Sequence, residues 1–244
     1  MAAASAVASR LSVVIPARNE AAIIDDCLSA LVHQSDPVDE IIVVDNGSTD
    51  STAERAAAYP GVTVLYEAVP GIGRTRALGF DAASGDIIAR IDADTIVDAG
   101  WAAALRSAFR NDPALAAVAG DVRQSHAGSA LTRLMVHVYG AFRVFHRTLF
   151  GAKVLLYGHN MALRREAWEA IRPLVSVDEQ VNEDIDVALA IRSLGGRMRF
   201  EPQVRAQVDL LRTLSPRKLV RYLRRDSVTR RKYELVAAEA ASGA

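Results

Sequence analysis

Residues 91–98 read IDADTIVD and place several carboxylates at the end of an apolar run. Asp92 and Asp94 are two positions apart, so on an extended backbone their side chains point to the same side. Both can therefore address one metal ion, and such oxygen ligands suit Mg²⁺ or Mn²⁺. A polar turn after a strand would account for the same residues without any chemistry. Asp98 fits this simpler interpretation, as a turn or cap residue.

Short apolar runs of this kind alternate with helical patterns in the first half of the chain. The runs LSVVIP, EIIVVD, VTVLYE and DIIARIDAD start at residues 11, 40, 62 and 86. Between the first two runs, NEAAIIDDCLSALVHQ has apolar residues at helical spacing. Strands of nearly unbroken Val and Ile that alternate with helices predict a parallel sheet covered on both faces.

Each of these runs is followed by a polar cluster. The clusters are ARNE, DNGSTD, PGIGRTR and DADTIVD. In open parallel sheets, ligands bind outside the carboxyl ends of the strands. We therefore expect the four clusters to converge on one cleft.

The second half of the chain is less regular. Residues 115–124 predict another strand, and 131–157 predict an amphipathic helical segment interrupted by basic residues. The stretch NEDIDVALAIRSLGG (182–196) predicts a helix that ends at a glycine pair. A last strand, RMRFEP, precedes a basic helix over roughly residues 215–237.

Length and composition indicate a globular protein. The chain has 244 residues, half of them hydrophobic, which is enough for one α/β domain or two small ones. No run approaches the roughly 18 uncharged apolar residues of a membrane span, and the start, MAAASAVASR, does not resemble a signal peptide. Cys27 is the single cysteine, so an internal disulfide is excluded. We expect a cytoplasmic protein.

The charge is distributed unevenly, although the formal net charge is zero. Residues 1–120 hold 16 acidic and 8 basic residues, a balance of −8, and residues 121–244 hold 13 acidic and 21 basic residues, a balance of +8. This asymmetry suggests that the second half meets an anionic partner. A basic tail can equally be a solvated helix face.

Six motifs in one order resemble the inverting glycosyltransferases of family 2, which have the GT-A fold. The motifs are VVIPARNE, VDNGSTDST, PGIGRTRALG, IDADT, GHNMALRRE and NEDIDVAL, and the resemblance covers about residues 11–205. It implies a single GT-A (Rossmann-like) α/β domain with a mostly parallel central sheet and helices on both faces, and the sequence pattern adds a C-terminal basic amphipathic helix. We expect a donor-binding half (10–125), an acceptor-binding and catalytic-base half (126–210) and, beyond the resemblance, a C-terminal helix and tail (211–244).

The resemblance implies a donor site for a nucleotide-diphosphate sugar and a divalent metal, Mn²⁺ or Mg²⁺. Asp94 would be the direct metal ligand, with Asp92 beside it. The donor-binding residues carried over from the motifs are Pro16, Ala17, Arg18, Asn19, Glu20, Asp45, Gly47, Arg76, Asp92 and Ala93.

This chain departs from the family pattern at two places in that donor and metal site. Ala77 stands where many relatives have Asn, and the stretch EPQVRAQVD lacks the His that often completes the metal shell. Gln207, Asp209 or the diphosphate and water would have to take its place.

The resemblance also implies the acceptor side. Asp184, in the motif NEDIDVAL, corresponds to the base that removes the proton of the acceptor hydroxyl, with Glu183 as neighbour and acceptor contact. Acidic residues at a helix start are common for dipole reasons alone, but this pair follows Asp94 by about 90 residues and follows GHNMALRRE. His159 and Asn160 would close the acceptor side of the cleft.

We therefore expect a metal-assisted inverting glycosyltransferase of the hexosyltransferase type that acts on a hydroxyl acceptor in a saccharide, lipid or small molecule. Transfer to a polyprenyl phosphate at the membrane surface is the nearest alternative. The amphipathic segment 131–157 and the basic tail favour it, whereas the Glu183–Asp184 pair disfavours it because a phosphate oxygen needs no base. A nucleotidyltransferase and a nucleotide-sugar-binding module without turnover are further alternatives. A dinucleotide-binding enzyme is disfavoured because residue 76 is Arg, so the pattern G-x-G-x-x-G is incomplete.

The basic helix leaves two interpretations open. Eight basic residues lie between Arg217 and Lys232, with Asp226 as the one acidic residue among them. A solvated helix face is favoured slightly over a peripheral contact of residues 212–236 with anionic lipid headgroups at the inner face of the membrane. Nucleic acid is not expected as a partner, because Tyr222 and Tyr233 are the only aromatic residues interleaved with the basic ones.

Overall fold

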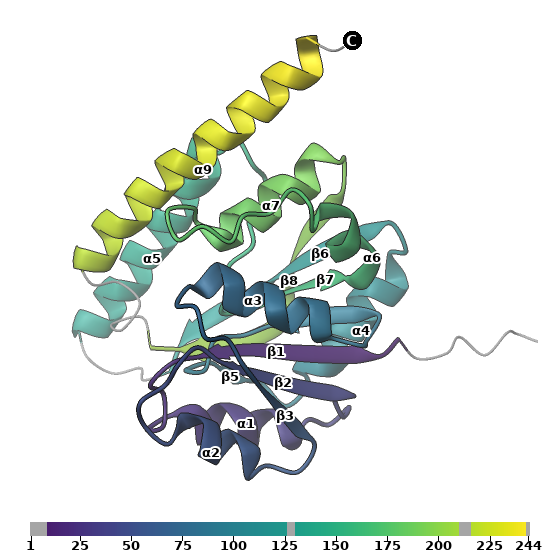
Figure 1. The fold of residues 1–244 in the computed structure, drawn as a ribbon, viewed down its shortest axis with the longest axis vertical. Coiled ribbons are helices and arrows are strands. Elements are labelled where there is room, and N and C mark those ends of the chain that lie inside the picture. Colours follow the sequence, from purple (N-terminus) through teal and green to yellow (C-terminus); the bar gives the residue numbers. More distant parts are fainter. Residues whose placement is uncertain (1–8, 126–129, 210–215, 243–244) are drawn as a thin grey trace, which may run out of the picture.

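The computed structural model describes residues 9–125, 130–209 and 216–242 (Figure 1). The predicted boundary at residue 126 and the residues 211–215 of the predicted C-terminal region lie outside these ranges. The strands are β1 (Leu11–Ala17), β2 (Glu40–Asp45), β3 (Val62–Tyr66), β4 (Ile87–Arg90), β5 (Ile96–Val97), β6 (Leu115–Gln124), β7 (Met161–Arg164) and β8 (Arg197–Val208). The helices are α1 (Ile24–Val32), α2 (Thr52–Ala57), α3 (Ile72–Ala82), α4 (Trp101–Asn111), α5 (Ala130–Leu149), α6 (Arg165–Ile171), α7 (Glu183–Ser193) and α9 (Pro216–Ser242).

The strands form one sheet in the order β3-β2-β1-β4-β7-β6-β8-β5. The pairs β2·β3, β1·β2, β1·β4 and β6·β8 are parallel. β7 runs antiparallel to both of its neighbours, and β5 runs antiparallel to β8. The predicted α/β fold with a mostly parallel sheet is therefore confirmed, and the two antiparallel strands are additions that the apolar pattern did not predict.

Two hydrophobic clusters cover the two faces of the sheet. Side chains alternate along β1, so Val13 and Ile15 join the cluster under α1 and α4, while Val14 joins the cluster under α3, α6 and α7. Trp101 and Phe109 of α4 are buried in the first cluster, and Phe80 and Trp168 are among the aromatic residues of the second. Helices on both faces explain why the strands are apolar on both sides.

The long helices α5 and α9 lie at one end of the molecule, beside α7 (Figure 1). Hydrogen bonds from Asn182 at the start of α7 reach Thr229 and Asp226 of α9, and Nε2 of His146 on α5 lies 2.8 Å from Oδ2 of Asp226. α9 is therefore anchored on one side by two other helices. None of the helices in the described ranges is both long and apolar enough to cross a bilayer.

Candidate active site

A cavity of about 450 Å³ lies at the carboxyl ends of β1 and β4. Its wall includes residues from the turns after these strands, from the start of α3 and from the helices α5, α7 and α9. Ten of the residues predicted from the sequence line it: Pro16, Ala17, Arg18, Glu20, Asp92, Ala93, Asp94, His159, Glu183 and Asp184. The other five, Asn19, Asp45, Gly47, Arg76 and Asn160, are not among the residues that line it.

The turns after β1 and β2 are joined through Asn19. Its φ of 56° is in the left-handed region, which Asn tolerates better than most residues. The side-chain oxygen of Asn19 accepts a hydrogen bond from the backbone N–H of Thr49 at 2.8 Å, and its own N–H donates to Ser48 Oγ at 3.0 Å. These bonds hold the ARNE turn, which carries Arg18 and Glu20 in the cavity wall, against the NGSTD turn.

Asp45 ends β2 and is buried. Its Oδ2 accepts the N–H of Ser48 at 3.1 Å, across the turn that contains Gly47. Its Oδ1 is buried and makes no hydrogen bond with the described residues. A buried carboxylate oxygen without a partner is costly, so this atom is suited to accept a hydrogen bond from a ligand.

Asn46 fixes the loop that leads into α3. Its Nδ2 donates to the carbonyls of Glu67 at 3.0 Å and Val69 at 2.9 Å, and its Oδ1 accepts the N–H of Gly71 at 2.9 Å. Asn46, Gly71 and Ile72 all line the cavity. From the sequence, Asn46 was only a member of the polar cluster DNGSTD, whereas in the structure it holds one wall of the cavity in place.

Asp92 and Asp94 both line the cavity, as their spacing predicts. The side chain of Asp92 is 39% exposed, and one of its oxygens pairs with Arg90 at 3.1 Å. No group of three or more His, Cys, Asp or Glu side chains suited to a metal ion occurs in the described part of the chain. Two carboxylates fit Mg²⁺ or Mn²⁺ when phosphate and water oxygens supply the other ligands, which is the usual arrangement at phosphate-binding magnesium sites. Gln207 and Asp209, the two residues that could take the place of the missing His, each bond another side chain. Gln207 Nε2 donates to Asp98 Oδ1 at 3.4 Å, and Asp209 Oδ1 accepts from Gln124 Nε2 at 3.3 Å.

Arg90 links the two acidic clusters. Its side chain is 3% exposed, and its guanidinium pairs with Asp184 at 2.5 Å, Asp92 at 3.1 Å and Glu183 at 3.5 Å. Burial alone would lower the pKa of Arg90, but the charges of Asp184, Asp92 and Glu183 raise this pKa above its ordinary value. The sequence analysis did not single out Arg90. The signal for it is an Arg in the last position of the otherwise apolar run IIAR, just before the DAD motif.

Asp184 is held on both sides at the first turn of α7. Its Oδ1 pairs with Arg90, and its Oδ2 accepts the backbone N–H of Gly158 at 2.6 Å. A Cβ at position 158 would lie 2.3 Å from Cζ of Arg90, so the GHN motif needs a glycine there for this close approach. Each carboxylate oxygen has two lone pairs, so both keep an acceptor position for a further partner.

The pKa values of both carboxyl groups in the Glu183–Asp184 pair are raised above the ordinary range. For Asp184, burial raises the pKa most, the Arg90 charge opposes this, and the Asp92 charge adds to it. For Glu183, burial is again the largest cause and the Asp184 charge is the second. A raised pKa makes a carboxylate a stronger base, which suits proton removal from a hydroxyl group.

Arg76 is fully buried behind the start of α7 and does not line the cavity. Its guanidinium donates to the carbonyl oxygens of Glu183 at 2.7 Å and Ser176 at 3.4 Å, and it lies 5.7 Å from the ring centre of Trp168. The sequence analysis predicted a donor contact for Arg76, whereas its hydrogen bonds reach the backbone that carries Glu183.

His159 and Asn160 have different surroundings, although they are adjacent. His159 is in the cavity wall, and its Nε2 lies 2.8 Å from the Tyr139 hydroxyl. Burial, with the charges of Arg143 and Arg90, lowers the pKa of His159 to about 3, so it is neutral. Asn160 is buried. Its Oδ1 accepts a hydrogen bond from Trp101 Nε1 at 2.9 Å, and its Nδ2 donates to two backbone carbonyls, so it joins α4 to β6 and β8 rather than facing the cavity.

The remaining wall comes from α5 and α9, which the sequence analysis did not assign to the site. α5 contributes Tyr139, Phe142 and His146, and α9 contributes Arg221, Tyr222 and Arg225. Asn182, directly before α7, also lines the cavity. The part of the wall formed by α5 and α9 is therefore aromatic and basic, and it includes residues of the predicted C-terminal helix.

Comparisons with known proteins give one family and a consistent set of relatives. The model of the family described as glycosyl transferase family 2 matches residues 12–172. The probable glycosyltransferase YdaM of Bacillus subtilis (strain 168) is 29% identical over 209 residues, which cover 79% of this chain and 49% of that protein. The poly-beta-1,6-N-acetyl-D-glucosamine synthase of Staphylococcus aureus (strain COL) is 28% identical over 197 residues, covering 75% and 46%. The chain thus spans about half the length of these curated relatives.

Two solved structures resemble the fold. Glucosyl-3-phosphoglycerate synthase from Mycobacterium tuberculosis, in complex with Mn²⁺, UDP-glucose and phosphoglyceric acid, has a TM-score of 0.58 and 25% identity, covering 83% of this chain and 70% of that one. The mannosyltransferase PcManGT from Pyrobaculum calidifontis, in complex with GDP-Man and Mn²⁺, has a TM-score of 0.64 and 22% identity, covering 98% and 77%. At this identity the second structure supports the fold alone.

Proposed function

The chain belongs to glycosyl transferase family 2, and from that premise we propose that it transfers a sugar from a nucleotide-diphosphate sugar to a hydroxyl acceptor with inversion. The observation that carries the proposal is the meeting of two acidic clusters in one cavity. Asp92 and Asp94 lie at the carboxyl edge of the sheet, and Asp184 lies across from them at the start of α7, with Arg90 between. One cluster suits a diphosphate with its cation, and the other suits a reacting hydroxyl.

The proposed donor site lies between the first two turns and the DAD motif. Asp45, whose buried Oδ1 is without a partner among the described residues, is proposed to accept a hydrogen bond from the nucleoside. Asp92 and Asp94 would hold Mn²⁺ or Mg²⁺, which supplies positive charge for the departing diphosphate. The Mn²⁺ and UDP-glucose in the solved relative with 25% identity support this donor class.

Asp184 is proposed as the base. In a single displacement, the acceptor oxygen forms a bond to the anomeric carbon, the bond from that carbon to the diphosphate oxygen breaks, and the hydroxyl proton passes to Asp184. Arg90 and the N–H of Gly158 hold the Asp184 carboxylate in place for this transfer. Glu183 and His159 are proposed to contact the acceptor. Arg76 supports the backbone of Glu183, and we assign it that role in place of a donor contact.

Transfer to a polyprenyl phosphate is the second candidate, and the surface of α5 and α9 favours it. Of the thirteen large hydrophobic side chains that are exposed in the described part of the chain, five lie on α5 and three on α9. Peripheral membrane contact through residues 212–236 belongs to this candidate, with residues 212–215 outside the described ranges. Asp184 argues for the hydroxyl acceptor, because an anionic phosphate oxygen has no proton to lose.

A thermal-shift panel of nucleoside diphosphates with and without Mn²⁺ tests the donor class. Ligand binding raises the melting temperature by mass action, so we expect one nucleotide to stabilise the protein, and only when Mn²⁺ is present. No response to any nucleotide would contradict the proposed function. Hydrolysis of the matching nucleotide sugar in the presence of Mn²⁺ would then argue against a binding module without turnover.

The acceptor class and the stereochemistry need separate measurements. The anomeric configuration of the product, read by NMR, should be opposite to that of the donor, and retention would contradict a single displacement. A pH–rate profile separates the two acceptors, because a hydroxyl acceptor requires the ionised form of Asp184. A phosphate acceptor would show no such dependence on Asp184.

A further inference from the structure

Asp226 of α9 is a buried carboxylate with partners on two other helices. It is 1% exposed, and its Oδ2 lies 2.8 Å from Nε2 of His146, which is itself 2% exposed. Its Oδ1 accepts a hydrogen bond from Nδ2 of Asn182 at 2.7 Å. A carboxylate is rarely buried unless it is paired, so these two contacts account for its place in the packed side of α9.

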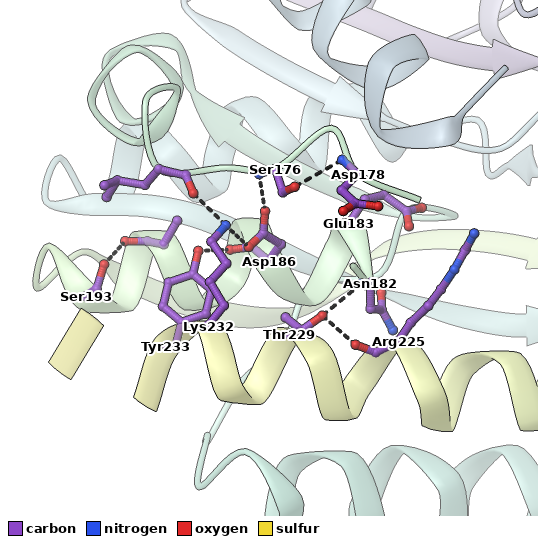
Figure 2. Close-up of polar contacts among 12 residues, drawn as sticks. Ser176, Asp178, Asn182, Glu183, Asp186, Ser193, Arg225, Thr229, Lys232 and Tyr233 are labelled. Carbon is purple, nitrogen blue, oxygen red and sulfur yellow. Dashed lines mark hydrogen bonds and ion pairs between the residues drawn. The ribbon is translucent and has the colours of Figure 1, made fainter. Parts of the chain in front are cut away.

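Asn182 is the residue on which α7 begins. An Asn at a helix start usually turns its side chain back to cap its own helix, but Asn182 makes no such bond. Its side chain is directed to Asp226, and its backbone N–H donates to Thr229 Oγ1 at 2.8 Å. Figure 2 shows α9 passing the start of α7, with Asn182 above Thr229. The start of α7 is therefore held by α9 rather than by its own cap.

The two residues that follow Asn182 are Glu183 and Asp184, the pair at the centre of the cavity. Their first helical turn is closed by the N–H of Asp186, which donates to the carbonyl of Asn182 at 2.8 Å. Any displacement of Asn182 would move both carboxylates relative to Arg90 and Gly158. The Asp184 carboxylate lies 2.5 Å from the Arg90 guanidinium and 2.6 Å from the backbone nitrogen of Gly158. Because both contacts are short, small displacements would weaken them.

We infer that Asp226 is a positioning residue for the reaction. It acts through Asn182 to set the place of the Glu183–Asp184 pair, so the part of α9 that contacts Asn182 positions the base. The inference rests on the proposed function of Asp184. It concerns a part of the chain beyond residue 172, where the match to the family model ends.

A second contact between the same helices supplies a matched control. One turn further along α9, the Tyr233 hydroxyl donates to the carbonyl of Asp186 at 2.9 Å (Figure 2). Thr229→Val and Tyr233→Phe are both nearly isosteric, and each removes one hydrogen bond between α9 and α7. They differ in that only Thr229 contacts Asn182. A general docking role for α9 predicts equal effects of the two changes, whereas a positioning role predicts unequal ones.

The experiment measures kcat and the donor KM for these two variants, with UDP-glucose and Mn²⁺ as the first donor tested. We expect Thr229→Val to lower kcat several-fold with the donor KM unchanged, and Tyr233→Phe to keep kcat within about twofold. Asp226→Ala should lower kcat roughly 10- to 100-fold, because a displacement of about 1 Å in a catalytic group can cost that much. Asp226→Asn should recover most of kcat, because its amide oxygen can still accept the hydrogen bond from Asn182.

Amide hydrogen exchange over residues 181–189 gives a readout that does not depend on activity. Faster exchange is expected in Asp226→Ala and Thr229→Val than in Tyr233→Phe or Asp226→Asn. Equal losses of kcat in Thr229→Val and Tyr233→Phe, or a wild-type kcat in Asp226→Ala, would overturn the positioning role. If the wild type transfers no sugar, the proposed function fails, and unchanged exchange in Thr229→Val and Asp226→Ala would then overturn the inference on its own.

Discussion

At the scale of residues, the side chains that line this cavity carry more negative than positive charge. Arg90 is one cation among the three carboxylates with which it pairs, and Asp94 adds a fourth carboxylate in the same wall. Such an excess is unfavourable unless protons or cations reduce it. The raised pKa values of Asp184 and Glu183 favour proton uptake, which reduces the negative charge. A divalent cation at Asp92 and Asp94 would reduce it as well. The base and the proposed metal site are thus electrostatically linked through Arg90.

Asp184→Asn should lower kcat by roughly 10²- to 10⁴-fold, the usual contribution of a general base. The amide can still accept hydrogen bonds from Arg90 or Gly158, so the donor KM and the nucleotide thermal shift should stay near wild-type values. The exposed Glu166, with a side chain 78% exposed, gives a matched acid-to-amide control in Glu166→Gln. Near wild-type transfer by Asp184→Asn would rule out Asp184 as the base.

The pH dependence of wild-type transfer follows from the same carboxyl group. Because burial raises the pKa of Asp184, the ionised base is lost at a higher pH than for an ordinary Asp, whose pKa is about 3.9. The acid limb of kcat/KM should therefore lie above that value, and transfer should fall as the pH drops through it. A limb at or below the ordinary value would show that a different group is titrating.

His159 should make stability depend on pH. Its pKa is lowered to about 3 in the fold, against about 6.5 in an unfolded chain. Between these values the unfolded chain binds a proton that the folded chain does not, so stability must fall as the pH decreases below about 6.5. The melting temperature of His159→Gln should fall less between pH 7 and 5 than that of the wild type, whereas the exposed His33→Gln should follow the wild type. Parallel curves for wild type and His159→Gln would contradict this.

At the scale of elements, the loop before α3 depends on a single amide. Asn46→Ala removes the three hydrogen bonds to Glu67, Val69 and Gly71, each contributing about 0.5–1.5 kcal/mol. We expect the donor KM to rise about tenfold with a smaller change in kcat, because this loop forms the wall beside the proposed donor site. Asn111→Ala, on an exposed residue at the end of α4, is the control. A lower melting temperature with an unchanged donor KM would limit Asn46 to a structural role.

The first half of the fold could be predicted because its strands and helices follow apolar periodicity. The runs at 11–16, 40–45 and 115–124 correspond to β1, β2 and β6 within one residue. β7 and β5 have four and two residues, too few for any periodicity to be read. Their antiparallel pairing depends on which strand ends meet in the folded sheet, which no local pattern encodes.

α9 was predicted as a helix, but its packed face was not recognised. The face that meets α7 and α5 includes the buried polar residues Asp226 and Thr229. Helix faces are recognised in sequences by apolar spacing, and a face that docks through hydrogen bonds and other polar contacts gives no such signal. Neither a solvated face nor a membrane contact describes the side of α9 that reaches the cavity, so both interpretations now apply to its outward side alone.

At the scale of the whole molecule, the outward side of α9 combines basic and apolar residues on one exposed face. Arg224, Val228, Arg231 and Leu235 are all exposed and follow one another at spacings of four, three and four residues, so they share one face of the helix. On α5, Leu134 and Phe145 are 55% and 49% exposed. Basic and apolar residues together on exposed helices are typical of proteins that lie on an anionic bilayer surface.

Sedimentation with vesicles tests this surface. The wild type should sediment with vesicles of phosphatidylglycerol and phosphatidylcholine, and hardly with phosphatidylcholine alone, because each basic residue near an anionic surface contributes about 1 kcal/mol. Raising the salt should release it, since the attraction is screened within about a Debye length. The double change Arg231→Gln with Leu235→Gln should reduce the bound fraction several-fold.

The matched control lies on a different part of the surface. Leu194 and Arg197 are 54% and 64% exposed, after α7 and at the start of β8, and Leu194→Gln with Arg197→Gln changes the same kinds of residue. Normal binding by this control and weak binding by the α9 pair would locate the contact on α9. Equal losses in both pairs, or no sedimentation of the wild type at low salt, would contradict a membrane contact. In that case the observation that favours the polyprenyl-phosphate candidate would be removed. Transfer to a hydroxyl acceptor, with Asp184 as the base, would be the remaining candidate.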